Sequence, residues 1–189
     1  MVIFLCRHGE RLDQVSSEWA RTATEPWDPP ITARGKKQIY NSVLQISKLG
    51  VESIVASPMR RTIESAEIAS ALLGIKFDID VGLVEWQNPE WFEELTIGNI
   101  RHLNKTISTW SGQYRQTTLP IFPETEGQAQ TRCTFAVQLL LKMNKKTLII
   151  AHENGITGVV ELLTKNKVKQ VNYGEILQLC TIDGRFKLC

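Results

Sequence analysis

The chain has 189 residues, and 42% of them are hydrophobic, which is enough to bury one sizeable core. The net charge of +2 comes from interspersed acidic and basic residues rather than from a basic block, which argues against a nucleic-acid or membrane partner. No stretch resembles a signal peptide or a membrane span, so we expect a cytoplasmic protein, with the nucleus as an alternative. We expect a single domain over residues 1–189.

The four cysteines are not spaced like the ligands of a zinc site. A chain of this size does not depend on disulfides for its stability, unlike a small secreted domain. We therefore expect Cys6, Cys133, Cys180 and Cys189 to be buried free thiols.

Strand-like and helix-like patterns alternate along the chain. Strands or extended pieces are predicted over residues 2–6, 53–56, 75–79, 83–86 and 148–151, with a closing hairpin over 176–182 and 186–188. Helices are predicted over residues 32–48, 59–73, 129–143 and 156–163, and glycines follow the first two, as is common at helix ends. This alternation predicts an α/β fold with a mostly parallel sheet.

Charged or nucleophilic side chains follow several of these strands. Arg7 and His8 follow the first strand, Arg61 lies shortly after the second, Glu85 lies in the extended piece 83–86, and His152 follows the strand 148–151. In open parallel sheets the residues just past the carboxyl ends of the strands converge on one edge, where ligands bind. Guanidinium groups bind phosphate oxygens, a neutral imidazole is a nucleophile, and a carboxyl group can protonate a leaving oxygen. The pattern predicts a site that binds and attacks a phosphate.

Four motifs in register carry a resemblance to a known family. They are Arg7-His8-Gly9-Glu10-Arg11, Ser57-Pro58-Met59-Arg60-Arg61 with Ser65-Ala66, Glu85, and Ala151-His152. Together they resemble the histidine phosphatase, or phosphoglycerate mutase-like, superfamily, and the Thr32…Gly35…Gln38 segment is similar to the start of that family's first helix. Cys6 to Arg11 with Gly82 to Trp86 is most similar to the suppressor of T-cell receptor signalling phosphatase domains and the ecdysteroid-phosphate phosphatases.

The resemblance implies a three-layer α/β/α sandwich with a short cap around residues 86–123, and phosphoryl transfer through His8. In that scheme Arg7, Arg11, Arg61 and His152 bind the phosphoryl oxygens, and Glu85 is the general acid and then the base. No metal ion or cofactor is implied. Arg60 and Arg61 are adjacent on a helix and cannot face the same way, and the family spacing selects Arg61 for the site. Glu153 places a carboxylate beside the anion pocket, where it must turn away or pair with a basic residue.

Three functions stay open at this point. The first is a phosphomonoester hydrolase acting on aryl or tyrosine phosphates, in small molecules or phosphoproteins, and Trp19, Trp27 and Trp86 are expected near its mouth. The second is a phosphoglycerate-type mutase, although such mutases carry a longer cap and a residue other than Arg11 after Arg-His-Gly-Glu. The third is a catalytically silent binding module, although none of the expected site residues is missing. Both a monomer and a homodimer are compatible with the sequence. His102 is expected to be exposed and without a role.

Overall fold

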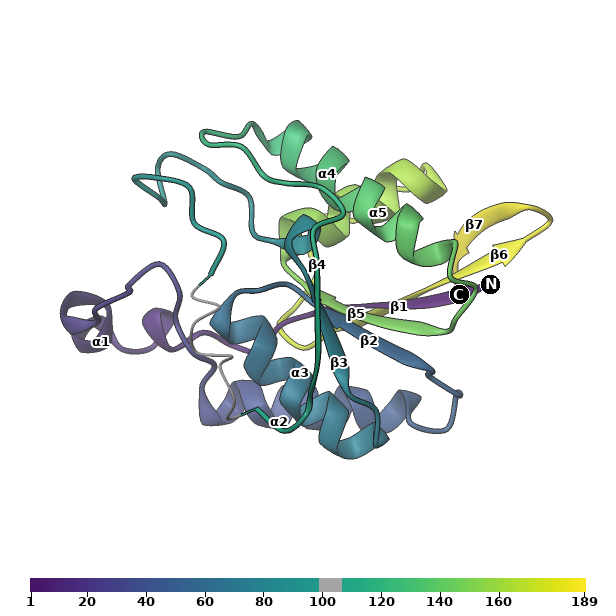
Figure 1. Ribbon diagram of the computed structural model, residues 1–189, viewed down its shortest axis with the longest axis horizontal. Helices are drawn as coiled ribbons and strands as arrows, with labels where there is room; N and C mark the ends of the chain where they lie inside the picture. The colour runs from purple at the N-terminus through teal and green to yellow at the C-terminus, as the bar shows by residue number, and fades with distance from the viewer. Residues whose placement is uncertain (99–106) are drawn as a thin grey trace.

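The computed structural model, described here for residues 1–98 and 107–189, is built around one seven-stranded sheet (Figure 1). The strands are β1 (Val2–Arg7), β2 (Ser53–Ala56), β3 (Phe77–Asp80), β4 (Trp110–Arg115), β5 (Thr147–Ala151), β6 (Ile176–Ile182) and β7 (Arg185–Leu188). Their order in the sheet is β4-β3-β2-β5-β1-β6-β7. The pairs among β1 to β5 are parallel, and β6 and β7 add an antiparallel hairpin at one side. The predicted mostly parallel sheet is therefore confirmed.

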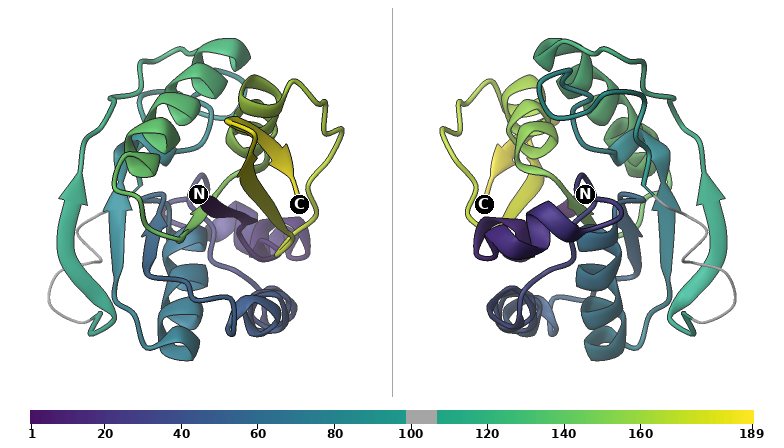
Figure 2. Two further views of the ribbon diagram at one scale, coloured as in Figure 1. Left: turned by 90° about the vertical axis from the view of Figure 1, so that its right-hand side faces the viewer. Right: turned by 90° about the vertical axis from the view of Figure 1, so that its left-hand side faces the viewer.

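Helices cover both faces of the sheet, so the fold is the expected three-layer α/β/α sandwich (Figures 1 and 2). Helices α2 (Ala33–Ile46) and α3 (Arg60–Leu73) pack on one face, and α4 (Glu126–Leu141) and α5 (Glu153–Thr164) pack on the other. Strand β1 serves both cores by simple alternation, because Ile3 and Leu5 point to the α4 and α5 side while Phe4 and Cys6 point to the α2 and α3 side. None of the helices formed by the described residues is long and apolar enough to cross a membrane.

The helices begin and end at residues that can bond or accommodate the unpaired backbone groups of a helix end. The side chain of Thr32 accepts a hydrogen bond from the Gly35 N–H at the start of α2, and Thr125 forms a reciprocal capping box with Gln128 at the start of α4. Gly74 ends α3 in the left-handed conformation, with φ of 68°, which glycine adopts without a steric penalty.

Three parts of the chain differ from the sequence-based expectation. A short helix α1 (Ser17–Thr22) lies before residue 28, and β4 joins the sheet from within the expected cap segment. Residues 83–86 form no strand, because the side chain of Asp80 accepts a hydrogen bond from the Gly82 N–H and starts a 3-10 turn, η2 (Val81–Leu83).

The expectation of four free thiols is wrong for two cysteines. Cys6 and Cys133 are buried and free, but Cys180 and Cys189 form a disulfide. The antiparallel pairing of β6 with β7 places Cys180 opposite Lys187, two residues from the end of the chain, so the hairpin itself brings the two thiols together.

Strands β2, β5 and β1 are neighbours in the sheet and run in the same direction. Their carboxyl ends therefore lie at one edge, and the residues that follow them, Ser57, His152 and His8, come together there. This edge positions the candidate site.

Candidate active site

A tight turn after β1 holds His8 in place. Gly9 lies so close to the start of α2 that a Cβ atom there would be 2.6 Å from the Gly35 carbonyl oxygen. The Glu10 N–H donates to Gln38 Oε1 at 3.0 Å. These contacts give a physical reason for the Gly35 and Gln38 positions of the helix-start motif, since both residues fix the turn that carries His8.

The His8 side chain is buried, with 2% of its surface exposed. Its Nδ1 lies 2.8 Å from the Gly9 carbonyl oxygen, which can only accept, so Nδ1 carries the proton and Nε2 keeps its lone pair. Burial, and after it the charges of Arg61 and His152, holds the pKa of His8 well below its usual range. His8 is therefore a neutral imidazole with one nitrogen available as a nucleophile.

His152 follows β5 and is also buried. Its Nε2 lies 2.8 Å from Ser57 Oγ, its Nδ1 lies 3.2 Å from Glu85 Oε2, and its ring centroid is 5.3 Å from that of His8. Burial lowers the pKa of His152 to about 4, against the opposing effect of Glu85. A second neutral imidazole thus lies beside the first.

Arg61 lies in the first turn of α3 and is 1% exposed. Its Nη2 is 3.3 Å from Glu85 Oε2, and its Nη1 is 3.5 Å from Asp28 Oδ1. Its buried Nε and Nη1 make no hydrogen bond among the described residues, so they are donors that an anion could use. Its neighbour Arg60 is half exposed and pairs with Glu64, so the structure places Arg61, and not Arg60, with the other predicted site residues.

Glu85 lies between Arg61 and His152. Burial acts to raise the pKa of its carboxyl group, but His152, Arg61 and His8 outweigh that effect and hold the pKa below its usual range. Glu85 is therefore a carboxylate in the free protein. A general-acid role requires that the arrival of a second anion raises this pKa, as like charges do at short range.

Arg7 is fixed from three directions. Its Nη1 donates to Glu153 Oε2 at 2.7 Å and to the Val171 carbonyl oxygen at 2.6 Å, and its guanidinium carbon lies 4.0 Å from the centre of the Tyr173 ring. Its buried Nε makes no hydrogen bond among the described residues. The carboxylate of Glu153 thus pairs with a basic residue, which is one of the two arrangements that the sequence allowed.

Arg11 is held by Asp13, with Nε to Oδ1 at 3.0 Å and Nη2 to Oδ2 at 2.5 Å. This bidentate pair keeps the guanidinium group in the wall of two cavities. All six predicted site residues therefore lie at the same edge of the sheet.

Two cavities meet at Arg11, Glu85 and Trp91, which line both of them. The larger has a volume of about 930 Å³ and is also lined by Trp27, Phe92 and Arg61. The second has a volume of about 690 Å³ and is also lined by Arg7, His8 and Trp86. Either cavity has the size of a small-molecule site.

A comparison with models of protein families matches residues 3–183 to the histidine phosphatase superfamily, branch 1. The chain belongs to the histidine phosphatase superfamily. The family resemblance found in the sequence motifs is thereby confirmed.

One curated member of the superfamily that the chain matches is distant in sequence. The chain is 30% identical over 95 residues to the probable phosphoglycerate mutase GpmB of Escherichia coli, a match that covers 46% of the chain and 41% of that enzyme. The chain thus spans less than half the length of this curated relative.

Solved structures show the same fold at low sequence identity. The ecdysone phosphate phosphatase of Bombyx mori, in complex with tungstate, is similar with a TM-score of 0.80 at 17% identity, covering 100% of this chain and 91% of that one. A mycobacterial glucosyl-3-phosphoglycerate phosphatase gives a TM-score of 0.70 at 19% identity, covering 100% and 96%.

Sequence reasoning missed a buried ion pair beneath Glu85. Arg132 on α4 bonds both carboxylate oxygens of Glu124 at 2.7 Å, and it also donates to the carbonyl oxygens of Gly82 at 2.9 Å, Val84 at 3.1 Å and Glu85 at 3.4 Å. This pair holds the irregular segment that presents Glu85. No local sequence pattern signals this pair.

Glu126, the first residue of α4, accepts a hydrogen bond from Asn154 Nδ2 at 2.9 Å. The structure also adds Asp28 and Tyr173 as partners of the site arginines, for which the sequence offered no signal. His102 lies outside the described residues.

His8, Glu85 and His152 could also hold a metal ion, since one ligand atom from each lies within 4.8 Å of the others. Two neutral imidazoles and a carboxylate are a ligand set that zinc accepts. The adjacent guanidinium group of Arg61 opposes a cation at this place, so the surroundings fit an anion better.

Proposed function

We propose that the protein is a phosphomonoester hydrolase that works through a phosphohistidine on His8. The observation that carries this proposal is the pairing of a neutral, tautomer-fixed His8 with the buried, unused N–H donors of Arg61. A nucleophile next to preorganised donors for a phosphoryl group is what this reaction requires.

In the first step Nε2 of His8 attacks phosphorus, and the bond from phosphorus to the ester oxygen breaks with its electrons going to that oxygen. Arg61, Arg7 and His152 bind the phosphoryl oxygens, where charge is concentrated during transfer. Arg11 completes the ring of donors from the cavity wall. Glu85, protonated once the phosphate dianion lies beside it, gives its proton to the leaving oxygen.

In the second step Glu85 is a carboxylate again and takes a proton from water as the water attacks phospho-His8. The bond from phosphorus to Nε2 breaks, inorganic phosphate leaves, and His8 returns to its neutral form. No step requires a metal ion, and metal independence is part of this proposal.

The substrate class that the site favours is an aryl phosphate, including tyrosine phosphate. The larger cavity has Trp27 and Trp91 in its walls, and their side chains are 44% and 54% exposed. Aromatic walls of this kind hold a flat apolar group with little loss of conformational entropy. Trp86 lines the second cavity and packs edge-on against Trp91, with ring centroids 5.1 Å apart, so it supports this wall.

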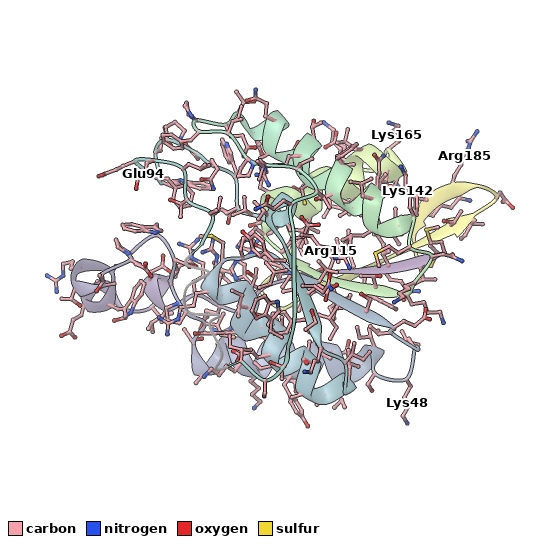
Figure 3. The ribbon with its side chains drawn as sticks, viewed as in Figure 1. Lys48, Glu94, Arg115, Lys142, Lys165 and Arg185 are labelled. Atoms are coloured by element: carbon pink, nitrogen blue, oxygen red, sulfur yellow. A yellow bond between two sulfur atoms is a disulfide. The ribbon has the colours of Figure 1, made fainter. Side chains whose placement is uncertain are left out.

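The proposal is tested by incubating the protein, without added metal and with a chelator, with an aryl phosphate. We expect release of inorganic phosphate by the wild type and loss of release in His8→Ala. Lys48→Ala, at the far end of the molecule, is the matched control and should leave the rate unchanged (Figure 3). Release that survives the loss of His8 would rule the mechanism out.

A phosphoglycerate-type mutase is the second candidate, and the match to the probable mutase of Escherichia coli favours it. The same incubation with 3-phosphoglycerate distinguishes the two. Exchange between phosphoglycerate isomers with little phosphate release would support the mutase, and release without exchange would support the hydrolase.

A further inference from the structure

Each arginine at the site is already paired with a carboxylate. The pairs are Arg7 with Glu153, Arg11 with Asp13, and Arg61 with Glu85 and Asp28. The positive charge of the guanidinium groups is therefore largely offset before any substrate binds. What remains for a phosphate is a set of directed donors, the buried Nε of Arg7 and the buried Nε of Arg61, which make no hydrogen bond among the described residues. These donors can bind one phosphoryl group. No unpaired guanidinium charge is left among them to attract a second anionic group.

Carboxylates outnumber cationic side chains in both cavities around these donors. Among the described residues the larger cavity has Glu85, Glu93 and Glu94 against Arg11 and Arg61. The second has Glu85, Glu126, Glu153 and Glu161 against Arg7, Arg11 and Lys169. Figure 3 shows Glu94 toward the end of the molecule where α1 lies, whereas Lys142 and Arg185 lie toward the opposite end. Among the described residues, the lining of both cavities is thus more acidic than basic.

Glu153 is a carboxylate of the second cavity that is held next to Arg7. It is the first residue of α5 and directly follows His152. Its Oε2 bonds Arg7 Nη1 at 2.7 Å, and its Oε1 accepts from the Val171 N–H at 3.3 Å. Its side chain is still 36% exposed, so a group in the second cavity can approach it. A second anionic group of the substrate in this cavity would be repelled by the Glu153 carboxylate. Arg7 could not offset this repulsion, because it is already paired with Glu153.

We propose that the site selects phosphomonoesters whose only anionic group is the phosphate, with a neutral or positively charged leaving group, and that Glu153 is the main determinant of this selection. The inference rests on the proposed hydrolase function and specifies its substrate class. It predicts discrimination against phosphoglycerates, sugar bisphosphates and acidic phosphopeptides.

The test uses three esters of matched shape: 4-(aminomethyl)phenyl, 4-(hydroxymethyl)phenyl and 4-(carboxymethyl)phenyl phosphate. Their leaving groups are alike except for a charge of plus one, zero or minus one. We expect kcat/KM to be highest for the cationic ester and lowest for the anionic one, with about a tenfold difference between them at low ionic strength that shrinks as salt is added. Equal values, or a preference for the anionic ester, would overturn the inference.

Glu153→Gln removes the charge and keeps an amide oxygen that can accept from the Val171 N–H. We expect it to raise kcat/KM for the anionic ester relative to the other two and so to narrow the range several-fold. Glu52→Gln is the matched control, because Glu52 precedes β2 at the opposite edge of the sheet and accepts from the Lys146 N–H at 2.9 Å. A purely structural role for Glu153 would instead lower the values for all three esters by the same factor, which would refute its role in selection.

Binding of the three corresponding phosphonates, measured by calorimetry, separates this inference from the proposed function. If the esters are not hydrolysed, the hydrolase proposal fails, and the order of phosphonate affinities still decides whether the site rejects a second anionic group. Equal affinities would overturn the selectivity itself.

Discussion

Replacing Arg132 with Met tests the idea that a buried ion pair presents Glu85. The side chains of Arg132 and Glu124 are only 5% and 2% exposed. In Arg132→Met the Glu124 carboxylate stays buried without its partner, and the carbonyl oxygens of Gly82 and Val84 lose their donor. The substitution therefore acts on both the stability of the fold and the position of Glu85.

The expected loss of stability follows from the burial of the pair. Breaking a buried ion pair by removing one partner costs about 3–5 kcal/mol, because the remaining charge has no compensation. For a chain of this length that corresponds to a fall in Tm of about 10 °C. The double variant Arg132→Met/Glu124→Leu removes the stranded charge, so we expect it to regain about 2 kcal/mol of the loss.

Urea unfolding followed by fluorescence measures these free energies. Arg115→Met is the matched control, because Arg115 forms a partly exposed pair with Asp78 at 2.7 Å, and a pair that water reaches contributes about 1 kcal/mol. Arg132→Lys keeps the positive charge but loses the planar guanidinium group with its several donors. We expect this variant to stay folded, but its kcat should fall by about a hundredfold because Glu85 is displaced. If Arg132→Met costs no more than Arg115→Met, the pair does not support the segment as described.

Three further predictions concern the site residues. Glu85→Gln should lower kcat for an alkyl phosphate by about 10²–10³ but far less for 4-nitrophenyl phosphate, because only the alkoxide needs a proton to leave. Equal losses of kcat for the two substrates would argue against general-acid catalysis. The pKa of His152 falls from 6.5 to about 4 on folding, so the unfolded chain binds the extra proton between these pH values. The free energy of unfolding should therefore drop by about 3 kcal/mol as the pH falls through that window, and the drop should be smaller in His152→Asn. Chelation should leave activity intact, because the proposed steps use only side chains and water. Activity that needs an added metal would contradict this.

The part of the site that lies at strand ends could be predicted from the sequence. Short apolar strands that alternate with helices predicted a parallel sheet containing β1, β2 and β5, and that topology alone brings His8 and His152 together. Adjacent helical residues point in different directions, so only one of Arg60 and Arg61 can face the site, and the family resemblance selects Arg61.

The rest of the site depends on packing that no local pattern reveals. Arg132 looks like a surface residue of a helix, and only the three-dimensional path of residues 82–85 turns it into a buried donor. Strand β4 lies at the edge of the sheet and has no fully buried residue, so it lacks the alternation that marks a strand. The pairing of Cys180 with Cys189 depends in the same way on the register of the hairpin.

Trapping the phosphoenzyme tests the central claim most directly. The protein is mixed with a ³²P-labelled aryl phosphate, quenched within milliseconds in alkali, and digested for mass spectrometry. We predict a label that is stable to alkali, labile to acid and located on His8, and absent from His8→Ala. Label on another residue, or full turnover with no phosphoenzyme at any quench time, would contradict the mechanism.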